Sequence, residues 1–330
     1  MPLPLEPAHG FMLMAAAFGA IVLSASATGI ALIYARRRGL LDLPGQRRSH
    51  HQPTPRGGGI GILAVAFLGL WMVWPLPFER MLWLTLPVAA IGMAGWIDDH
   101  RGLPVFPRLL VQVVAALAAV AALSGLEAGL VFAVLAILGV VGSTNVMNFM
   151  DGSNGMATLQ GIFLATAGML LAGAASQLDW ALWCLLLACA CLGFLPFNVP
   201  RARIFLGDVG STSLGFCLGV AGVALIAGEV ITVWQALILV SAFLADAACT
   251  LAWRMWRGRR WYTAHREHTY QWLIRSGLSH LEVAAAYMAW NILLVSPLML
   301  LAMHRPEWQP ALTIGVYGLA LAAWVGARAL

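Results

Sequence analysis

The feature that most constrains this chain is a series of long apolar runs that recurs from end to end. A spanning α-helix needs about 20 apolar residues to cross about 30 Å of hydrocarbon, and most of the runs approach that length. Apolar residues make up 61% of the chain and charged residues 10%, against about 25% charged in soluble domains. We therefore predict an all-α polytopic membrane protein, a single integral domain over residues 1–330. Its roughly eleven transmembrane helices are expected at about 11–34, 58–77, 81–97, 107–124, 128–146, 158–175, 179–197, 210–228, 230–251, 282–303 and 310–327.

The basic residues lie almost entirely on one side of this topology. The chain has 19 of them, all arginine, and only Arg80 and Arg305 fall on the outer side if the N-terminus is outside. Because cytoplasmic loops carry the excess of arginine, we predict the N-terminus outside and the C-terminus inside. No basic region precedes the first run and no small-residue cleavage site follows it, so we interpret it as a retained span. The inner loops are then expected at about 35–57, 98–107, 147–157, 198–209 and 252–281.

Two adjacent carboxylates, Asp98 and Asp99, end the third run in the segment GWIDDHRGLP. Their charges oppose each other and the dipole at the end of a helix, so the pair is unfavourable there. A divalent cation, or the use of one carboxylate as a base, accounts for such a pair. We interpret both as site residues.

A third carboxylate, Asp208, lies in FLGDVGSTSLG. Gly207 and Gly210 would let a ligand approach the backbone, and Ser211 or Thr212 would cap a helix whose N-terminus attracts phosphate. Taken alone, Asp208 is equally well explained as an ordinary N-cap. Because other acidic loops lie on the same side, we predict that it binds a metal.

The segment NVMNFMDGSNG combines amides and a carboxylate at the end of an apolar run. Asn145, Asn148 and Asp151 recur every third residue, so they share one face if the fifth helix continues that far. Gly152 and Gly155 would then end the helix. A simple turn is the alternative, but paired asparagines in an apolar helix end favour a polar ligand at the membrane surface.

The segment AHREHTYQ carries His265 and His268. Two imidazoles without a cysteine are a poor zinc site. Among neighbouring arginines they fit a pyrophosphate or a proton transfer better, while a basic segment lying on anionic lipid stays open as an alternative. Asp246, inside the ninth run, needs a partner and is either an arginine's counter-ion or a site residue.

Carboxylates, histidines and arginines gathered on one side of a membrane predict phosphoryl transfer assisted by Mg²⁺, with one polar and one lipid substrate. A lipid-linked sugar transporter is the main alternative. Transporters tend to place ionisable groups near the bilayer midplane within two related halves. Here the charges lie at helix ends, which favours the enzyme.

Four segments in this order, WIDDHRGLP, NVMNFMDGSNGMA, FLGDVGSTSLG and AHREHTYQ, resemble the polyprenyl-phosphate N-acetylhexosamine-1-phosphate transferases, the family of WecA, WbpL and MraY. The resemblance covers about residues 40–275. It implies transfer of a sugar-1-phosphate from a UDP-N-acetylamino sugar to undecaprenyl phosphate, with release of UMP, at the cytoplasmic face of the bacterial inner membrane. It also implies Mg²⁺, or Mn²⁺ in its place, as cofactor. Members of the family can form homodimers, and we expect no nucleic-acid partner.

The resemblance assigns roles residue by residue. Asp208 would be the main metal ligand with Asp99 beside it, and Asp98 would deprotonate the attacking lipid phosphate; a two-step route through a covalent aspartyl intermediate stays open. The implied catalytic residues are Asp98, Asp99, Asp151, His265 and His268. The implied substrate-binding residues, at the ribose, diphosphate, uracil and sugar, are Asn145, Asn148, Asn154, Phe205, Arg56, Arg266, Tyr270 and Gln271.

Two departures bear on the branch of the family. MraY-like members have adjacent histidines and a lysine in the first inner loop, whereas this chain has HREH and PTPRGGG. These features and the eleventh run resemble the WbpL and WecA branch. We therefore expect a role in O-antigen or another surface polysaccharide, with an MraY-like role as the alternative. The sugar, whether GlcNAc, FucNAc or QuiNAc, is expected to depend on residues 254–280.

Overall fold

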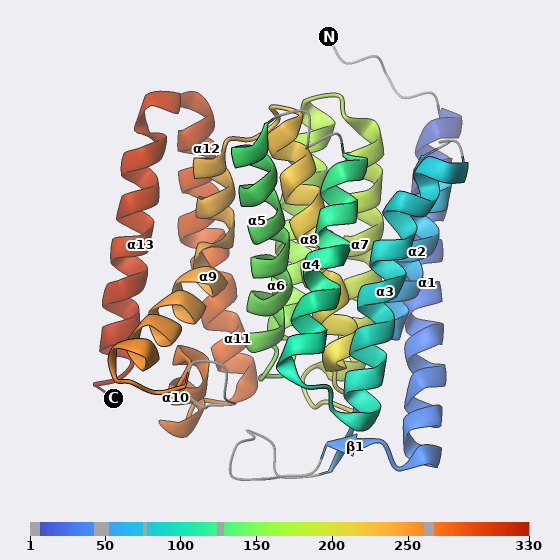
Figure 1. Cartoon of the computed structure of the whole chain (residues 1–330), viewed down its shortest axis with the longest axis horizontal. Helices are drawn as coiled ribbons and strands as arrows, with labels where there is room; N and C mark the ends of the chain where they lie inside the picture. The colour runs from blue at the N-terminus through green and yellow to red at the C-terminus, as the bar shows by residue number, and fades with distance from the viewer. Residues whose placement is uncertain (1–6, 43–52, 75–77, 124–128, 261–266, 330) are drawn as a thin grey trace.

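The computed structural model describes residues 7–42, 53–74, 78–123, 129–260 and 267–329. These parts are almost entirely helical, apart from the short antiparallel strands β1 (Leu41–Asp42) and β2 (Thr54–Pro55). The helices run roughly side by side, with α1 at one edge and α13 at the other (Figure 1). Their bounds are α1 (Pro7–Arg38), α2 (Ile60–Val73), α3 (Phe78–Arg101), α4 (Val105–Ala122), α5 (Leu130–Phe149), α6 (Met156–Ala174), α7 (Leu178–Asn198), α8 (Gly207–Ala227), α9 (Val233–Trp256), α10 (Thr269–Arg275), α11 (His280–Ala289), the π-helix η1 (Trp290–Val295), α12 (Ser296–His304), the 3-10 helix η2 (Pro306–Trp308) and α13 (Gln309–Gly326).

Ten helical segments in the described ranges are long and apolar enough to cross a membrane. One of them, His280–His304, is built from α11, η1 and α12 in succession. Large apolar side chains are exposed on the outer helices, for example Phe18 on α1, Leu130 on α5 and Ile314 on α13. Such a surface suits lipid rather than water. The chain is a multi-pass membrane protein, as predicted.

The second predicted span, 58–77, is wrong in its length. The helix α2 that replaces it has 14 residues and begins only at Ile60. Gly57 has a φ of 92°, which is outside the helical region. The next two residues pair with a distant loop, because Gly58 N–H donates to the carbonyl of Phe205 and Gly59 N–H to that of Leu206, both at 2.9 Å. Gly58 and Gly59 therefore form a turn that is bonded to this loop, and the helix begins after them.

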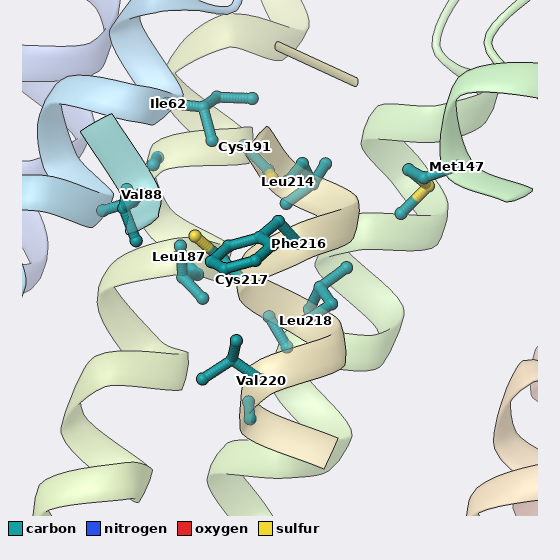
Figure 2. Packing of buried hydrophobic residues seen from close by; sticks show 14 of the residues in the cluster. Ile62, Val88, Met147, Leu187, Cys191, Leu214, Phe216, Cys217, Leu218 and Val220 are labelled. Carbon is teal, nitrogen blue, oxygen red and sulfur yellow. The ribbon is translucent and has the colours of Figure 1, made fainter. Parts of the chain in front are cut away.

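The helix α8 lies at the centre of the bundle and is buried on almost every side. It packs mainly against α2, α3, α5 and α6, so its position is fixed from several sides. Figure 2 shows this core, with side chains of α8 among those of its neighbours: Ile62, Val88, Met147, Leu187, Cys191, Leu214, Phe216, Cys217, Leu218 and Val220. A rigid central helix gives the residues at its N-terminus a fixed place.

The segments with unusual chemistry gather on one side of the bundle. The strand β1, the lower end of α3, the helix α10 and the end of α13 all lie on this side (Figure 1). The first turn of α8 also belongs to it, since Asp99 of α3 bonds to that turn. On the opposite side, Trp74 packs against Trp180, with ring centroids 4.8 Å apart. Tryptophan is enriched at membrane interfaces, so these rings are suited to mark the other surface.

Candidate active site

The carboxylate of Asp99 caps a helix other than its own. The backbone N–H groups of Asp208 and Val209 donate to its two oxygens, at 3.0 Å and 3.1 Å. Because α3 continues to Arg101, Asp99 lies in the last turn of α3 and faces the first turn of α8. A negative charge there is stabilised by the free amides and the dipole of α8. This contact places the end of α3 against the first turn of α8.

The neighbouring carboxylate of Asp98 faces α4. It accepts the backbone N–H of Leu103 at 2.6 Å and forms an ion pair with Arg108 Nη1 at 2.7 Å. A small recess between α3, α4 and α8 opens beside this pair. Its lining is Ile91, Ala94, Gly95, Asp98, Arg108, Gln112, Asp208 and Thr212. The recess therefore brings an arginine and two carboxylates together.

The two asparagines of α5 serve different neighbours. Asn148 donates to Asp208 Oδ1 at 2.5 Å, which links the end of α5 to the start of α8. Asn145, one turn earlier, donates to Gln112 Oε1 of α4 at 2.6 Å. The structure thus places Asn148 directly on Asp208, while Asn145 reaches the recess through Gln112.

The third residue of this pattern, Asp151, lies beyond the end of α5 rather than on it. Burial, together with the nearby carboxylates of Asp208 and Asp99, raises the pKa of Asp151 well above its usual value. Like charges close together disfavour ionisation, and a cation between them would relieve the repulsion. Three acidic residues from α3, the loop after α5 and α8 therefore lie in one electrostatic cluster.

Glycines allow the backbones around this cluster to touch. A Cβ at Gly207, which has a φ of 75°, would lie 2.6 Å from Asp99 Oδ2, and one at Gly210 would lie 2.6 Å from the Cα of Gly59. The chain itself occupies the space beside both glycines, and the expected approach of a ligand to their backbone stays a prediction. Ser211 and Thr212 are also not caps, since their hydroxyls donate back to carbonyls of their own helix, at Gly207 and Asp208.

The residue Arg56 reaches the same cluster from the loop before α2. Its positive charge acts on both Asp99 and Asp208. Its buried Nε has no hydrogen-bond partner among the described residues. A buried donor without a partner costs free energy, so an anionic group in this position would satisfy it.

The loop after α5 is tied to the loop before α8. Gly155, with a φ of 75°, begins the turn into α6, and its N–H donates to Asn198 Oδ1 at 2.5 Å. Asn154 donates weakly to the carbonyl of Pro200, at 3.4 Å. The backbone of Phe205 pairs with Pro55 on one side and Gly58 on the other, and its ring is half-buried. Asn154 and Phe205 therefore flank the acidic cluster on loops that bond to one another.

The histidine segment is only partly within the described residues, because His265 and Arg266 lie outside them. His268 is buried, with its Nδ1 3.8 Å from Asp246 Oδ1. Its ring stacks near that of Phe149, with centroids 6.4 Å apart. His268 thus lies beside the end of α5, facing Asp246 rather than the acidic cluster.

The next residues of this segment pack against the loop after α5. Tyr270 donates its hydroxyl to the carbonyl of Phe149 at 3.3 Å, and Gln271 donates to that hydroxyl at 3.1 Å. A Cβ on Gly152 would lie 2.7 Å from Tyr270 Cζ. Gln271 also accepts the backbone N–H of His268, which fixes the first turn of α10. In the structure Tyr270 and Gln271 hold loops together.

Comparison with known proteins identifies the family. The model of "Glycosyl transferase family 4" matches residues 81–226. Phospho-N-acetylmuramoyl-pentapeptide-transferase of Synechococcus sp. (strain JA-2-3B'a(2-13)) is 30% identical over 316 residues, which cover 82% of this chain and 88% of that protein. The chain belongs to glycosyl transferase family 4. Decaprenyl-phosphate N-acetylglucosaminephosphotransferase of Mycobacterium tuberculosis (strain ATCC 25618 / H37Rv) is 29% identical over 316 residues, which cover 82% of this chain and 78% of that protein.

The protein is therefore a phosphoglycosyl transferase of family 4, and the resemblance drawn from its four segments is confirmed. The transporter alternative does not hold. The match to the family model contains the acidic cluster and both asparagines of α5, and it ends before the histidine segment. Both kinds of relative match at similar identity, so identity alone does not separate the two branches of glycosyl transferase family 4.

The acidic cluster of this family 4 enzyme fits a hard divalent cation by its donor chemistry. Carboxylate and amide oxygens are the ligands Mg²⁺ prefers, and Mg²⁺ is often held by one or two carboxylates together with substrate phosphates. Within the described ranges, no three acidic, cysteine or histidine side chains form a complete metal site. Burial and the neighbouring carboxylates of Asp208 and Asp99 raise the pKa of Asp151, and a cation between these carboxylates would offset their repulsion. The residues thus suit a cation that arrives with a phosphate-bearing substrate.

Three residues of the arrangement were not among the predicted site residues. Arg108 and Gln112 line the recess from α4, and Asn198 holds the turn into α6. A sequence signal existed for the first two, because polar residues one helical turn apart in an apolar span are costly and mark a function. Asn198, the last residue of α7, precedes a polar segment of the sequence and gave no such signal.

Proposed function

We propose that the protein transfers an N-acetylhexosamine-1-phosphate from a UDP-sugar to undecaprenyl phosphate and releases UMP. The observation that carries this proposal is the cluster of Asp98, Asp99, Asp151 and Asp208 beside Arg56 and Arg108. Arginine suits phosphate and paired carboxylates suit a divalent cation. The names of the relatives support the substrates, since one is a decaprenyl-phosphate N-acetylglucosaminephosphotransferase.

The chemistry joins the lipid phosphate to the β-phosphate of the donor and separates that β-phosphate from the α-phosphate. An oxygen of the lipid phosphate attacks the β-phosphorus of the UDP-sugar, a new P–O–P bond forms, and the bond to the α-phosphate breaks as UMP leaves. A bound Mg²⁺, with Mn²⁺ as a substitute, would neutralise the charge of the diphosphate. Asp208, with Asp99 beside it, would hold that ion.

The chain's own residues prepare this attack. Arg108, paired with Asp98 at the mouth of the recess, would bind the lipid phosphate, and Asp98 would accept its proton. Both oxygens of Asp98 and of Asp99 already accept hydrogen bonds. This engagement favours direct displacement over a covalent aspartyl intermediate, because an oxygen that accepts hydrogen bonds is a weaker nucleophile. Asn148 and Asp151 would lie at the ribose and diphosphate.

The remaining predicted residues would bind the donor. Phe205 would stack on the uracil and Asn154 would bond to its edge, while Asn145 supports the recess through Gln112. Arg56 would use its unpartnered Nε on a phosphate oxygen. His265 and Arg266 would serve the diphosphate or the sugar, with the buried His268, Tyr270 and Gln271 behind them.

The orientation belongs to the same proposal. The arginine bias places the site on the cytoplasmic face of a bacterial inner membrane, with the C-terminus inside. A C-terminal green fluorescent protein fusion should then fluoresce, whereas a C-terminal alkaline phosphatase fusion should stay inactive; the reverse pattern would overturn the orientation. The HREH form of the histidine segment supports a role in O-antigen or another surface polysaccharide. A homodimer stays an expectation from the family.

The experiment that tests the reaction measures UMP release by the purified protein. It needs undecaprenyl phosphate, Mg²⁺ and a panel of donors: UDP-GlcNAc, UDP-FucNAc, UDP-QuiNAc and UDP-MurNAc-pentapeptide. Asp208→Asn should abolish release, while the matched control Asp179→Asn, an exposed carboxylate at the first turn of α7, should not. Release with the pentapeptide donor alone would favour the MraY-like role. Folded protein that releases no UMP with any of these donors would contradict the proposal.

The same assay decides the route. Radioactive UMP should not exchange into the UDP-sugar without lipid phosphate if displacement is direct. Exchange in the absence of lipid would show a covalent sugar-phosphate intermediate on the enzyme and would refute the direct route.

A further inference from the structure

A polar network joins the end of the last helix, α13, to the segment that carries His268. On α13, Trp324 Nε1 donates to Thr250 Oγ1 of α9 at 3.0 Å. Arg328, two residues after the end of α13, donates to the same hydroxyl at 3.3 Å and to the backbone carbonyl of Glu267. The guanidinium of Arg328 also lies over the Trp324 ring, 3.4 Å from its centroid. The C-terminal end of the chain is thus bonded to the residue just before His268.

The carboxylate of Asp246, also on α9, holds the other side of the same segment. Both of its oxygens accept the backbone N–H of Thr269, at 2.8 Å and 3.0 Å. Tyr287 of α11 donates its hydroxyl to Asp246 at 2.7 Å, and Thr250 donates to it at 3.2 Å. Thr250 therefore connects the carboxylate of Asp246 to the end of the chain, since it donates to Asp246 and accepts bonds from Trp324 and Arg328. Asp246 is a buried acceptor for this segment.

The side chain of Glu267 is fixed as well. Arg254 and Arg259 both donate to its carboxylate, the second at 3.0 Å. Glu267 therefore has its side chain held by α9 and the residues after it, and its carbonyl held by α13. A backbone that is held before and after His268 resists displacement, because several of these bonds would have to break together for it to move.

Residues 267–270 in turn pack against the loop after α5, which carries part of the acidic cluster. Tyr270 bonds to the carbonyl of Phe149, and Phe149 directly follows Asn148, which bonds to Asp208. Gly152, next to Asp151, packs against the Tyr270 ring. A shift at residues 267–270 would therefore pass to the loop that carries Asn148 and Asp151, and misplacement of about 1 Å at such groups can cost up to about a hundredfold in rate.

We propose that Arg328 is a positioning residue of the transferase site, acting from the end of α13 through the carbonyl of Glu267. The statement rests on the proposed transferase function for its kinetic effect, although the contact itself does not. The last helix then has a task beyond crossing the membrane, since it holds the histidine segment against the acidic cluster.

The test compares three variants of the full-length protein: Arg328→Ala, Arg328→Lys and Arg257→Ala. Arg257 is a matched control because its guanidinium also lies over a tryptophan, Trp253, at 4.2 Å, and no hydrogen bond of its side chain to residues 267–270 is present in the described chain. We expect Arg328→Ala to lower kcat roughly tenfold, which is about 1.4 kcal/mol, with the KM for the UDP-sugar and the melting temperature nearly unchanged. Lysine should restore much of kcat, because an ammonium can still donate to the carbonyl.

Hydrogen exchange provides a readout that does not need activity. The amides of residues 267–275 should exchange faster in Arg328→Ala and not in Arg257→Ala. Unchanged exchange there, or a loss of kcat that is matched by Arg257→Ala, would overturn the proposal. If the wild-type protein releases no UMP, the transferase proposal fails, and the exchange rates still decide whether Arg328 holds this segment.

Discussion

Replacing Gly207 by alanine tests whether the contact between Asp99 and α8 organises the site. Gly207 has a φ of 75°, and an added Cβ would lie 2.6 Å from Asp99 Oδ2 and 2.7 Å from the backbone nitrogen of Gly57. The left-handed conformation costs alanine about 1–2 kcal/mol. The Cβ would also push Asp99 away, and a hydrogen bond to a charged group contributes about 1.5–3 kcal/mol. With one of the two bonds lost, Gly207→Ala should destabilise the fold by about 2.5–5 kcal/mol.

The control is the same substitution on the same helix. Gly222 of α8 has open space where its Cβ would lie, so Gly222→Ala should be neutral or stabilise by about 0.5–1 kcal/mol. Thermal unfolding in detergent, followed by tryptophan fluorescence, measures both variants, and UMP release measures the site. Equal melting temperatures and equal activities for the two variants would refute the reasoning, because the Asp99 contact would then have no energetic weight.

Three further predictions follow from the same geometry. Asn148→Ala removes the amide that donates to Asp208, and it should lower Mg²⁺-dependent UMP release at least tenfold, which corresponds to about 1.4 kcal/mol. A titration of the activity with Mg²⁺ measures this effect, and an unchanged Mg²⁺ requirement would contradict the prediction. Because the pKa of Asp151 is raised, protons compete with the metal for this carboxylate, so Mg²⁺ should bind more tightly as the pH rises through that pKa. The metal-free protein should lose stability over the same pH range, because the folded state binds the proton more tightly than the unfolded state does. Asp151→Asn should remove most of both pH dependences. Gln160 and Asn291 form a buried pair, so Gln160→Leu with Asn291→Leu should cost less than the sum of the single changes in melting temperature; additivity would argue against the pair.

Much of the fold followed from the apolar pattern. The runs predicted at 81–97 and 310–327 correspond to the helices α3 and α13, because a long apolar stretch in lipid has no alternative to a helix. The pattern failed at α2, where the residues are as apolar as in a true span. The helix starts two residues late because Gly58 and Gly59 pair with residues 205–206, about 150 positions away, and a local pattern carries no information on such a contact. It ends at Val73 because Trp74 is extended before Pro75, and the residue before a proline disfavours the helical conformation.

For the candidate site, the sequence predicted which residues belong to it but not which residues they contact. Short polar segments at helix ends showed that Asp98, Asp99, Asn148 and Asp208 belong on one face, and the structure brings them together. Their partners were not predictable, because Asp99 caps a helix more than a hundred residues later in the chain. His268 lay in a polar, arginine-rich segment typical of an exposed loop, yet its ring is buried against Asp246. Asp246 itself left two interpretations open, and the structure makes it an anchor for backbone.

The shortness of α2 has a consequence for where the reaction takes place. Fourteen helical residues span about 21 Å, less than the roughly 30 Å of a bilayer's hydrocarbon. The helix ends at Val73, next to Trp74, whose ring packs with Trp180 at the surface opposite the site. Beyond the start of α2 the chain continues as the loop of Gly57, Gly58 and Gly59, and this loop meets carboxylates carried by helices of full length: Asp99 near the end of the 24-residue α3 and Asp208 at the start of the 21-residue α8. Under the proposed function, the backbone of this loop rather than a further helix end lies beside the carboxylates, at the depth where a lipid phosphate meets the water-soluble nucleotide.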